Sequence, residues 1–362
     1  FHFMFLFLLP VFFISFEVSE AVTIRDDRTL VSITRRSPSA GIASLSSTKD
    51  PVVHDAVDVT AIPHMLASKL SDSRRLSTDP RLAAVEDCLQ NPDAVETLGM
   101  IGVQSINTKS EDCPVSLDDL KSYLEDAGRE LGLDVLCEPN IEVKIGDSVS
   151  EPRIAETTAQ VAGWFGGWPK SDVDSDDPLA RYQDNLELIN IDGAWKNVDS
   201  SGKTPKEIIL AIVDTGVDSS HPDLKDQMWT ASDGSHGYNF VDNDENTSDL
   251  NGHGTHCAGI AAAQTDNDVG IAGIADVKIM ALRAFGADGT GGMLATLQGL
   301  NWAVSNGATV SSHSYTSDGS STVFLQAIQS AAKVGHVVVV ASGNDGVDVD
   351  EEPRFPCSFA TA

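Results

Sequence analysis

Two histidines and a cysteine lie close together in the segment NGHGTHCAGIAAA, residues 251–263, and all three side chains can do chemistry. His253 and His256 could form a metal-binding pair, be two core residues, or be one catalytic base beside a structural neighbour. A zinc site would need a third ligand, and zinc proteases with paired histidines on one helix also need a glutamate, which HGTH lacks. The segment therefore favours a catalytic base, with a zinc-dependent hydrolase that uses both histidines as an alternative.

A carboxylate and an amide stand at the ends of two other apolar runs. Asp214 closes IILAIVD, residues 208–214, and Asn344 follows HVVVVAS in the segment GNDG. A carboxylate can fix the tautomer of a histidine and stabilise the imidazolium that forms when the ring accepts a proton. A side-chain amide can donate a hydrogen bond to an oxyanion. We therefore expect Asp214, His253 and Asn344 to share one site, which also needs a nucleophile.

A regular alternation of elements, beginning at Glu207, must position these residues. Apolar, β-branched runs predict buried strands, and the segments between them have the length and the closing glycines of helices. The expected strands are 208–214, 277–285, 308–314 and 336–342, and the expected helices begin at 253 and span 292–307 and 321–335. This alternation predicts an α/β fold with a parallel sheet covered by helices on both faces. Ligands collect at the carboxyl ends of such strands, where Asp214, Ser314 and Asn344 stand.

Three segments resemble signature blocks of the subtilisin-like serine proteases, or subtilases. They are AIVDTGVDSSHPDL, NGHGTHCAGIAAA and VVVVASGNDG, and they occur in the family's order over roughly residues 178–362. The resemblance implies a subtilisin-like fold in which Asp214 is the orienting acid, His253 the general base and Asn344 the oxyanion donor. It makes His256 a structural neighbour. Cys257 resembles the free thiol beneath the catalytic histidine of some subtilases, and we expect it to be a small buried residue.

The family's fourth block, a Gly-Thr-Ser-x-Ala segment that carries the nucleophile, does not occur in the sequence. We expect the chain to be a C-terminally truncated fragment of a serine endopeptidase precursor, with the nucleophilic serine beyond Ala362. Ser314 and Ser342 are therefore not assigned as nucleophiles, and the fragment itself is expected to be inactive. The alternative is a catalytically inactive subtilase-fold binding protein.

The resemblance also implies a structural calcium site and a substrate-binding strand. TDNDVGIAG, residues 265–273, resembles the family's calcium loop, and oxygen ligands suit this hard cation. The implied ligands are the carboxylate of Asp223, the side chain of Asn267 and the carbonyls of Thr265, Val269 and Ile271. SSHSYTSDG lies where subtilases have the strand that binds the substrate backbone, which assigns Ser314 and Tyr315 to substrate binding. Thr316 replaces the family's glycine there, which puts the shape of the specificity pocket in doubt.

The N-terminal half is expected to consist of segments that are removed during maturation. Residues 1–21 form an apolar run ending in a small-x-small pattern, which predicts a signal peptide. By position and resemblance, 22–175 is a propeptide region, with an inhibitor-like α+β unit at about 85–150, and 176–362 is the first part of the catalytic domain. Residues 116–132 have helical spacing and 133–145 reads as strand. The acidic run SDVDSDD, residues 171–177, reads as a solvated linker.

The amino-acid composition limits the classes of binding partner and the cellular compartment that we expect for this protein. The formal net charge of −30 over 362 residues offers no basic patch for a nucleic acid, but an acidic surface suits calcium. The five cysteines are too scattered for a disulfide scaffold and predict at most one or two bridges. No second apolar run could span a bilayer. These observations argue against a nucleic-acid or membrane partner after signal removal. The resemblance to subtilases implies a secreted protein with protein or peptide substrates and its own propeptide as inhibitor.

Overall fold

The computed structural model describes residues 24–35, 80–91, 94–100, 103–107, 113, 115–131, 133–145, 173–201 and 207–359. The chain divides into two compact units. One is built from Thr23–Ile141 with Ser321–Ser330, and the other from Glu142–Ser320 with Ala331–Ala362. The signal peptide predicted for residues 1–21 lies outside the described residues.

The first unit is a small α+β structure. Its antiparallel sheet has the strand order β4-β1-β3-β2. The strands are β1 (Ile24–Arg35), β2 (Val95–Leu98), β3 (Val103–Asn107) and β4 (Leu133–Ile145), and the helices are α2 (Pro80–Gln90) and α3 (Leu117–Leu131). Its core joins side chains of both helices to the sheet, and Cys88 forms a disulfide with Cys113. One bridge is within the range that the cysteine count predicts.

Helix α3 follows directly from its sequence. Asp119 donates its backbone N–H to the Ser116 hydroxyl over 3.0 Å, and that hydroxyl donates back to the Asp119 carboxylate over 2.7 Å, which caps the first turn. Leu120 and Leu124, four residues apart, are buried in the core of the first unit. The predicted helix at 116–132 and the predicted strand at 133–145 are therefore confirmed, within one residue at each end.

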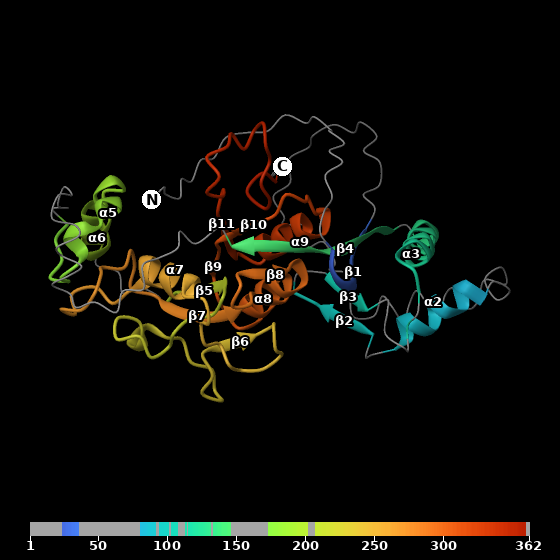
Figure 1. The fold of residues 1–362 in the computed structure, drawn as a ribbon, viewed down its shortest axis with the longest axis horizontal. Coiled ribbons are helices and arrows are strands. Elements are labelled where there is room, and N and C mark those ends of the chain that lie inside the picture. The colour runs from blue at the N-terminus through green and yellow to red at the C-terminus, as the bar shows by residue number, and fades with distance from the viewer. Residues whose placement is uncertain are drawn as a thin grey trace, which may run out of the picture. The chain divides into compact units, whose positions relative to one another are not determined.

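The second unit contains a five-stranded, fully parallel sheet in the order β11-β9-β5-β7-β6 (Figure 1). The strands are β5 (Ile209–Asp214), β6 (Gly237–Asn239), β7 (Lys278–Arg283), β9 (Val310–His313) and β11 (Val337–Val340). Four of these are the predicted strands, each shortened by one to three residues at its ends. Because β5 is the central strand, its carboxyl end, where Asp214 stands, is flanked by β7 on one side and β9 on the other.

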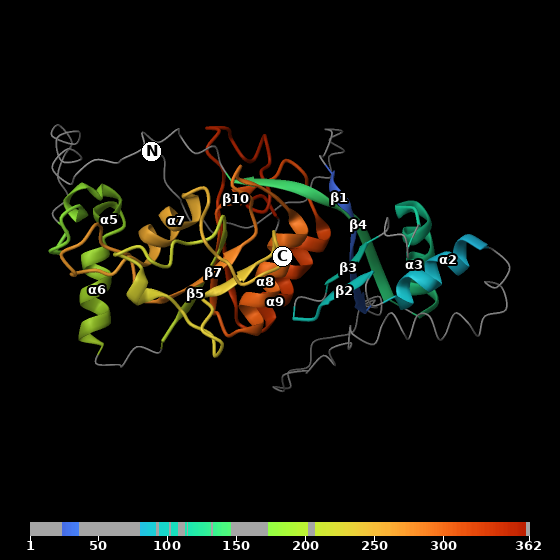
Figure 2. The ribbon, with the colours of Figure 1, turned by 60° about the horizontal axis from the view of Figure 1, so that its bottom comes forward.

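Helices cover both faces of this sheet, as predicted (Figures 1 and 2). Successive side chains of a strand point to opposite faces. Ile212 of β5 packs in one cluster with Ala258 and Ala262 of α7 (His253–Ala262). The next residue, Val213, faces α8 (Met293–Ser305), where a Cβ on Gly299 would lie 3.0 Å from its Cγ1. The third predicted helix is α9 (Thr322–Lys333).

Shorter elements complete the second unit. Helices α5 (Asp184–Leu188) and α6 (Ile191–Ser200) share an apolar cluster with Ala272. The short helical turns are η2 (Ala180–Tyr182) and η3 (Lys225–Gln227), and two short strands are β8 (Thr290–Gly292) and β10 (Tyr315–Thr316). The last residues of β4 pair antiparallel with both short strands, Glu142 opposite Gly292 and Ile145 opposite Tyr315. An extended segment therefore lies between β8 and β10.

No helix among the described residues is long and apolar enough to cross a membrane.

Candidate active site

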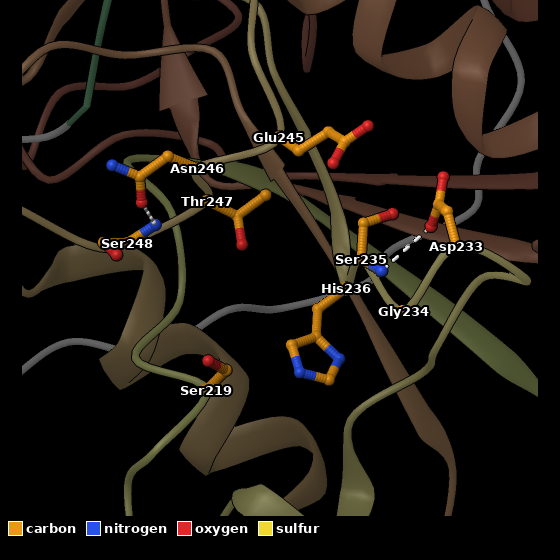
Figure 3. A pocket seen from close by; sticks show the side chains of 9 residues that line it. All are labelled: Ser219, Asp233, Gly234, Ser235, His236, Glu245, Asn246, Thr247 and Ser248. Atoms are coloured by element: carbon orange, nitrogen blue, oxygen red, sulfur yellow. Dashed lines mark hydrogen bonds between the residues drawn. The ribbon is translucent and has the colours of Figure 1, made fainter.

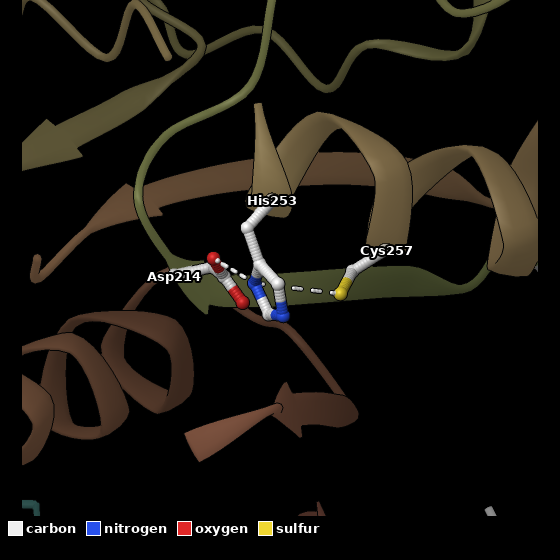
Figure 4. A group of neighbouring side chains, drawn as sticks. All are labelled: Asp214, His253 and Cys257. Carbon is white, nitrogen blue, oxygen red and sulfur yellow. Dashed lines mark hydrogen bonds and ion pairs between the residues drawn. The ribbon is translucent and has the colours of Figure 1, made fainter. Parts of the chain in front are cut away.

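Asp214 and His253 meet at the carboxyl end of β5, as the sequence predicts. His253 is the first residue of α7, and its Nδ1 lies 2.8 Å from Oδ1 of Asp214 (Figure 4). The Asp214 carboxylate is 1% exposed, and Oδ1 also accepts the backbone N–H of Thr215 over 2.7 Å. Because the ionised carboxylate only accepts hydrogen bonds, Nδ1 carries the proton in the neutral ring. The other ring nitrogen, Nε2, is then the acceptor and can serve as a base.

The surroundings of His253 favour its protonated form. Burial of the ring lowers the pKa of His253, but the hydrogen bond and the negative charge of Asp214 outweigh this, with a further contribution from Cys257, so the net shift is upward. A raised pKa means that the imidazolium formed after proton uptake is stabilised by the site. The pair is thus suited to accept a proton and hold it until a leaving group takes it.

Two glycines allow the helix and the strand to approach this closely. A Cβ on Gly254, the residue after His253, would lie 2.1 Å from the carbonyl oxygen of Gly216. Gly216 itself has φ of +110°, and a Cβ there would lie 2.5 Å from the Thr247 carbonyl oxygen. The glycines in the segments DTG and HGTH are therefore required by backbone contact on both sides of the Asp214–His253 pair.

Asp249 is a residue of this site that the sequence analysis did not identify. Its carboxylate accepts five hydrogen bonds from the residue after β5, from the loop before α7 and from the first turn of α7. The donors are the Thr215 hydroxyl (2.8 Å), the N–H groups of Asn251 (3.0 Å), Gly252 (2.8 Å) and Thr255 (2.9 Å), and the Thr255 hydroxyl (2.7 Å). Partial burial raises the pKa of Asp249, but these hydrogen bonds outweigh it and the pKa is lowered. The signal in the sequence is an aspartate a few residues before a helix start, a position that favours capping acids.

Cys257 lies one helical turn after His253, on the same side of α7. Its Sγ is 3.8 Å from Nδ1 of His253 (Figure 4). The Cys257 side chain is half-buried. Across the residues that the structure describes, Asp214, His253 and Cys257 form the one group of three histidine, cysteine or acidic side chains placed closely enough to hold a metal ion. His256 is exposed and outside this group. The geometry therefore gives no support to a zinc site that uses both histidines.

The remaining predicted residues lie at the ends of neighbouring strands. Ser314 follows β9 and is half-buried, and Asn344 follows β11 and is exposed. Since β11, β9 and β5 are adjacent, Ser314 and Asn344 stand at the same edge of the sheet as Asp214. The side chain of Tyr315 is fully buried, so it is not an exposed contact for a substrate. The backbone of Tyr315 pairs with Ile145.

Part of the predicted calcium-ligand set comes together around Asp223. Its carboxylate is 2% exposed in the folded chain and accepts the Asn267 side-chain amide (3.1 Å) and the backbone N–H of Ile271 (3.0 Å). The amide oxygen of Asn267 accepts the N–H of Val269 over 2.7 Å. Thr265 uses its hydroxyl to donate to the Gly273 carbonyl. The backbone atoms of Ile271 and Val269 in these contacts are N–H groups, so the predicted carbonyl ligands stay a prediction.

Asp177 also contacts this loop, and the interpretation of its segment as a solvated linker was wrong for this residue. It is 4% exposed and accepts the N–H groups of Asp266 (2.9 Å) and Asn267 (3.0 Å). Burial raises the pKa of Asp223, and the negative charge of Asp177 raises it further. Two buried or nearly buried carboxylates thus approach the same loop, an arrangement that a cation would stabilise.

A polar pocket lies apart from the Asp214–His253 pair (Figure 3). Its lining includes Asp233, His236, Glu245 and Asn246, and it contains neither member of the pair. The His236 Nδ1 is 2.9 Å from the Trp229 carbonyl oxygen, so this ring nitrogen donates a hydrogen bond within the fold. We assign no chemistry to this pocket.

Known proteins show the same sequence pattern. The peptidase S8 family model, described as the subtilase family, matches residues 205–361. Thermitase from Thermoactinomyces vulgaris is 41% identical over 189 residues, which cover 52% of this chain and 63% of thermitase. Subtilisin BL from Lederbergia lenta is 38% identical over 162 residues, which cover 44% of this chain and 55% of that protein. The chain therefore spans less than two thirds of the length of these relatives.

A solved structure shows the same fold. Fervidolysin from Fervidobacterium pennivorans, described as a keratinolytic enzyme related to subtilisin, aligns with a TM-score of 0.56 at 22% identity, covering 95% of this chain and 43% of fervidolysin. This likeness confirms the predicted subtilisin-like α/β fold. The predicted resemblance to the subtilisin-like proteases is confirmed as well, because residues 205–361 match the subtilase family model.

Proposed function

We propose that the complete protein is a secreted serine endopeptidase precursor that hydrolyses peptide bonds through an Asp-His-Ser triad. The observation that carries this proposal is the 2.8 Å contact between Asp214 Oδ1 and His253 Nδ1, which leaves Nε2 of His253 as the base. The nucleophilic serine is supplied by sequence outside the 362 residues, because no Gly-Thr-Ser segment occurs within them. The relatives thermitase and subtilisin BL support this reaction class.

In the proposed mechanism, Nε2 of His253 takes the proton of the serine hydroxyl as its oxygen attacks the substrate carbonyl carbon. The carbonyl oxygen becomes an oxyanion, to which the Asn344 side-chain amide donates a hydrogen bond. The imidazolium, held by Asp214, then gives its proton to the leaving amine. Water repeats the sequence on the acyl-enzyme and releases the second product.

The same proposal assigns the earlier part of the chain to a propeptide. We propose residues 22–175 as the propeptide region and 176–362 as the first part of the catalytic domain, with the propeptide acting as an intramolecular inhibitor. The antiparallel pairing of residues 142–145 with β8 and β10 supports this role, since an extended substrate would bind a strand edge by the same main-chain hydrogen bonds. A signal peptide at 1–21 and secretion complete the proposal.

We further propose a structural calcium ion at the loop that follows α7. The side chains of Asp223, Asn267 and Asp177 would hold it, together with the predicted carbonyls of Thr265, Val269 and Ile271. Its chemistry there would be electrostatic, because burial, with the negative charge of Asp177 in addition, raises the pKa of Asp223, and a divalent cation would stabilise both ionised carboxylates. Protein or peptide substrates, rather than nucleic acids or membranes, are the proposed partners, in keeping with the net charge of −30.

The complete gene provides the test. If an in-frame Gly-Thr-Ser-x-Ala block follows Ala362, the full-length protein is expressed and assayed for self-processing and for hydrolysis of a denatured protein substrate. We expect His253→Ala to abolish both, whereas His256→Ala, a change at an exposed neighbour, leaves both intact. A stop codon, a substituted serine or an active His253→Ala variant would refute the triad and favour an inactive subtilase-fold binding protein.

A further inference from the structure

A ladder of polar side chains runs along one face of the extended segment that leads from β9 into β10, where an apolar core would be the usual choice. Ser311 and His313 of β9 and Tyr315 of β10 alternate along this segment and therefore point to the same face. The Ser311 hydroxyl lies 2.7 Å from Nε2 of His313, and Nδ1 of His313 lies 2.7 Å from the Tyr315 hydroxyl. At the other end, Nε2 of His336 is 2.8 Å from the Ser311 hydroxyl, and its Nδ1 is 2.8 Å from the Ala308 carbonyl oxygen.

With both histidines neutral, the hydrogen bonds of the ladder can run from donor to acceptor in only one direction. The Ala308 carbonyl can only accept, so Nδ1 of His336 carries the proton and Nε2 accepts from Ser311. The single hydroxyl hydrogen of Ser311 is then used, so its oxygen accepts from Nε2–H of His313. Nδ1 of His313 is left as an acceptor, and the Tyr315 hydroxyl must donate to it. Each ladder group, from the Ala308 carbonyl through His336, Ser311 and His313 to the Tyr315 hydroxyl, then has a hydrogen-bond partner.

Burial keeps the ladder neutral. Ser311, His313 and Tyr315 are fully buried, and His336 is 4% exposed. Burial, followed by the proximity of His336, lowers the pKa of His313 to about 3, and burial also lowers the pKa of His336. Neither ring therefore carries a charge near neutral pH. Buried networks of this kind fix one arrangement of their members when every hydrogen bond is made.

The ladder ends at the residue that begins β10. The Tyr315 ring packs against Phe285 with a centroid distance of 5.1 Å and against the His313 ring at 5.5 Å. The hydroxyl also interacts with the Thr296 side chain of α8. The backbone of Tyr315 is paired with Ile145 in the strand edge that receives an extended segment. Fixing the Tyr315 side chain thus fixes the position of that edge.

We propose that His313 is a positioning residue for substrate binding, which holds the β10 edge in place through the hydroxyl of Tyr315 for an extended peptide segment. This inference rests on the proposed function, since it assigns the β10 edge to the peptide substrate. It makes a histidine that touches neither the substrate nor the reacting atoms necessary for substrate affinity.

The direction of the ladder can be measured without any enzymatic activity. The full-length protein, with histidine labelled by ¹⁵N, is examined by NMR at neutral pH. We expect His313 as the Nε2–H tautomer and His336 as the Nδ1–H tautomer. The opposite tautomer at His313, or a charged ring, would overturn the ladder.

Substitution of Tyr315→Phe tests positioning, because it removes the hydroxyl and keeps the ring. Tyr238→Phe is the matched control, since Tyr238 is a half-buried tyrosine on β6 outside the ladder. In Tyr315→Phe we expect KM for peptide substrates to rise about 3- to 10-fold, as for loss of one hydrogen bond, while kcat stays within about twofold. We also expect the backbone amides of residues 315–317 to exchange their hydrogens at least about fivefold faster, with neither change in the control.

The outcomes separate the two proposals. Unchanged KM and unchanged amide exchange in Tyr315→Phe would overturn the positioning role, even if the variant were less stable and the enzyme active. Faster exchange in a full-length protein that hydrolyses no peptide would refute the proposed function, while it would support positioning of the edge for the protein's own segment at 142–145. His313→Gln, which keeps one donor and one acceptor, should give a smaller rise in KM than His313→Leu, and equal effects of the two would contradict the proposal.

Discussion

Removing the charge of Asp249 should destabilise the second unit and loosen its Asp214–His253 pair. The carboxylate accepts five hydrogen bonds, two of them from Thr255 and one from Thr215. In Asp249→Asn one oxygen is kept, but the new NH₂ group faces donors, so the two hydrogen bonds on that side are lost. Hydrogen bonds to a charged group contribute about 1.5–3 kcal/mol each, and partial exposure places the sum near the low end, at about 2–3 kcal/mol.

The pH dependence of this effect follows from the lowered pKa of Asp249. A carboxyl group whose pKa is lower in the folded state stabilises the fold above its unfolded value, which is about 3.9 for aspartate. That contribution disappears as the pH falls through the folded-state pKa. The difference between parent and Asp249→Asn should therefore be constant from about pH 5 to pH 8 and shrink below about pH 4.

Calorimetry on the full-length protein measures this difference, with His253→Ala in every sample to prevent self-digestion. For a domain of this size, about 2–3 kcal/mol corresponds to a melting temperature roughly 5–10 °C lower at pH 7. Asp233→Asn is the control, because the hydrogen bonds to this exposed carboxylate come from Ser235 and from the backbone of Asp233 itself, and none comes from α7 or the end of β5. A parent and an Asp249→Asn variant that melt within about 1 °C of each other, or a difference that is as large at pH 3 as at pH 7, would refute the reasoning.

Four further expectations concern the site and its supports. Asn344→Ala should lower kcat about 10²- to 10³-fold with little change in KM, a magnitude known from subtilisin itself and not worked from this structure, and steady-state kinetics measure it. Cys257→Ala should move the acid limb of the kcat/KM profile to lower pH, because the thiol contributes to the raised pKa of His253, which must lose its proton to act as base. Calcium at one hundred times its dissociation constant should raise the free energy of unfolding by about 2.7 kcal/mol and so raise the melting temperature. Asp177→Asn should weaken this response. Glu138→Gln should lower the free energy of unfolding in urea by about 1 kcal/mol, because its carboxylate accepts the first N–H groups of α9.

The elements that the sequence predicts correctly are those whose stability is local or whose apolar run is long. Strand β5 and helix α7 could be predicted from the sequence, because a β-branched run and an alanine-rich helix follow patterns that depend on neighbouring residues. Strands β6 and β8 were not predicted, and β10 was expected only from the resemblance to subtilases, because two or three residues carry no period. They are strands because of the partners beside them, and those partners are distant in the sequence.

The same distinction separates the residues of the candidate site that could be predicted from the sequence from those that could not. Asp214 and His253 could be brought together from the sequence, because strand ends in a parallel sheet meet at one edge. Asp177 could not, since an acidic run is usually solvated, and its burial depends on the backbone of Asp266 and Asn267, about ninety residues later. The burial of the Tyr315 side chain could not be predicted either, because alternation along a strand does not tell which face is covered.

The segments DTG and HGTH act as one structural unit because Thr215 and Asp249 connect them. The Thr215 hydroxyl donates to Asp249 and accepts the backbone N–H of Gly254 over 3.0 Å, so it joins the end of β5 to the first turn of α7. The Asp214 carboxylate and the His253 ring, adjacent to these residues, are thereby held at 2.8 Å by backbone contacts as well as by their own attraction. A pair held in this way needs little reorganisation when the ring accepts a proton, which is the condition for effective proton transfer at a fixed site.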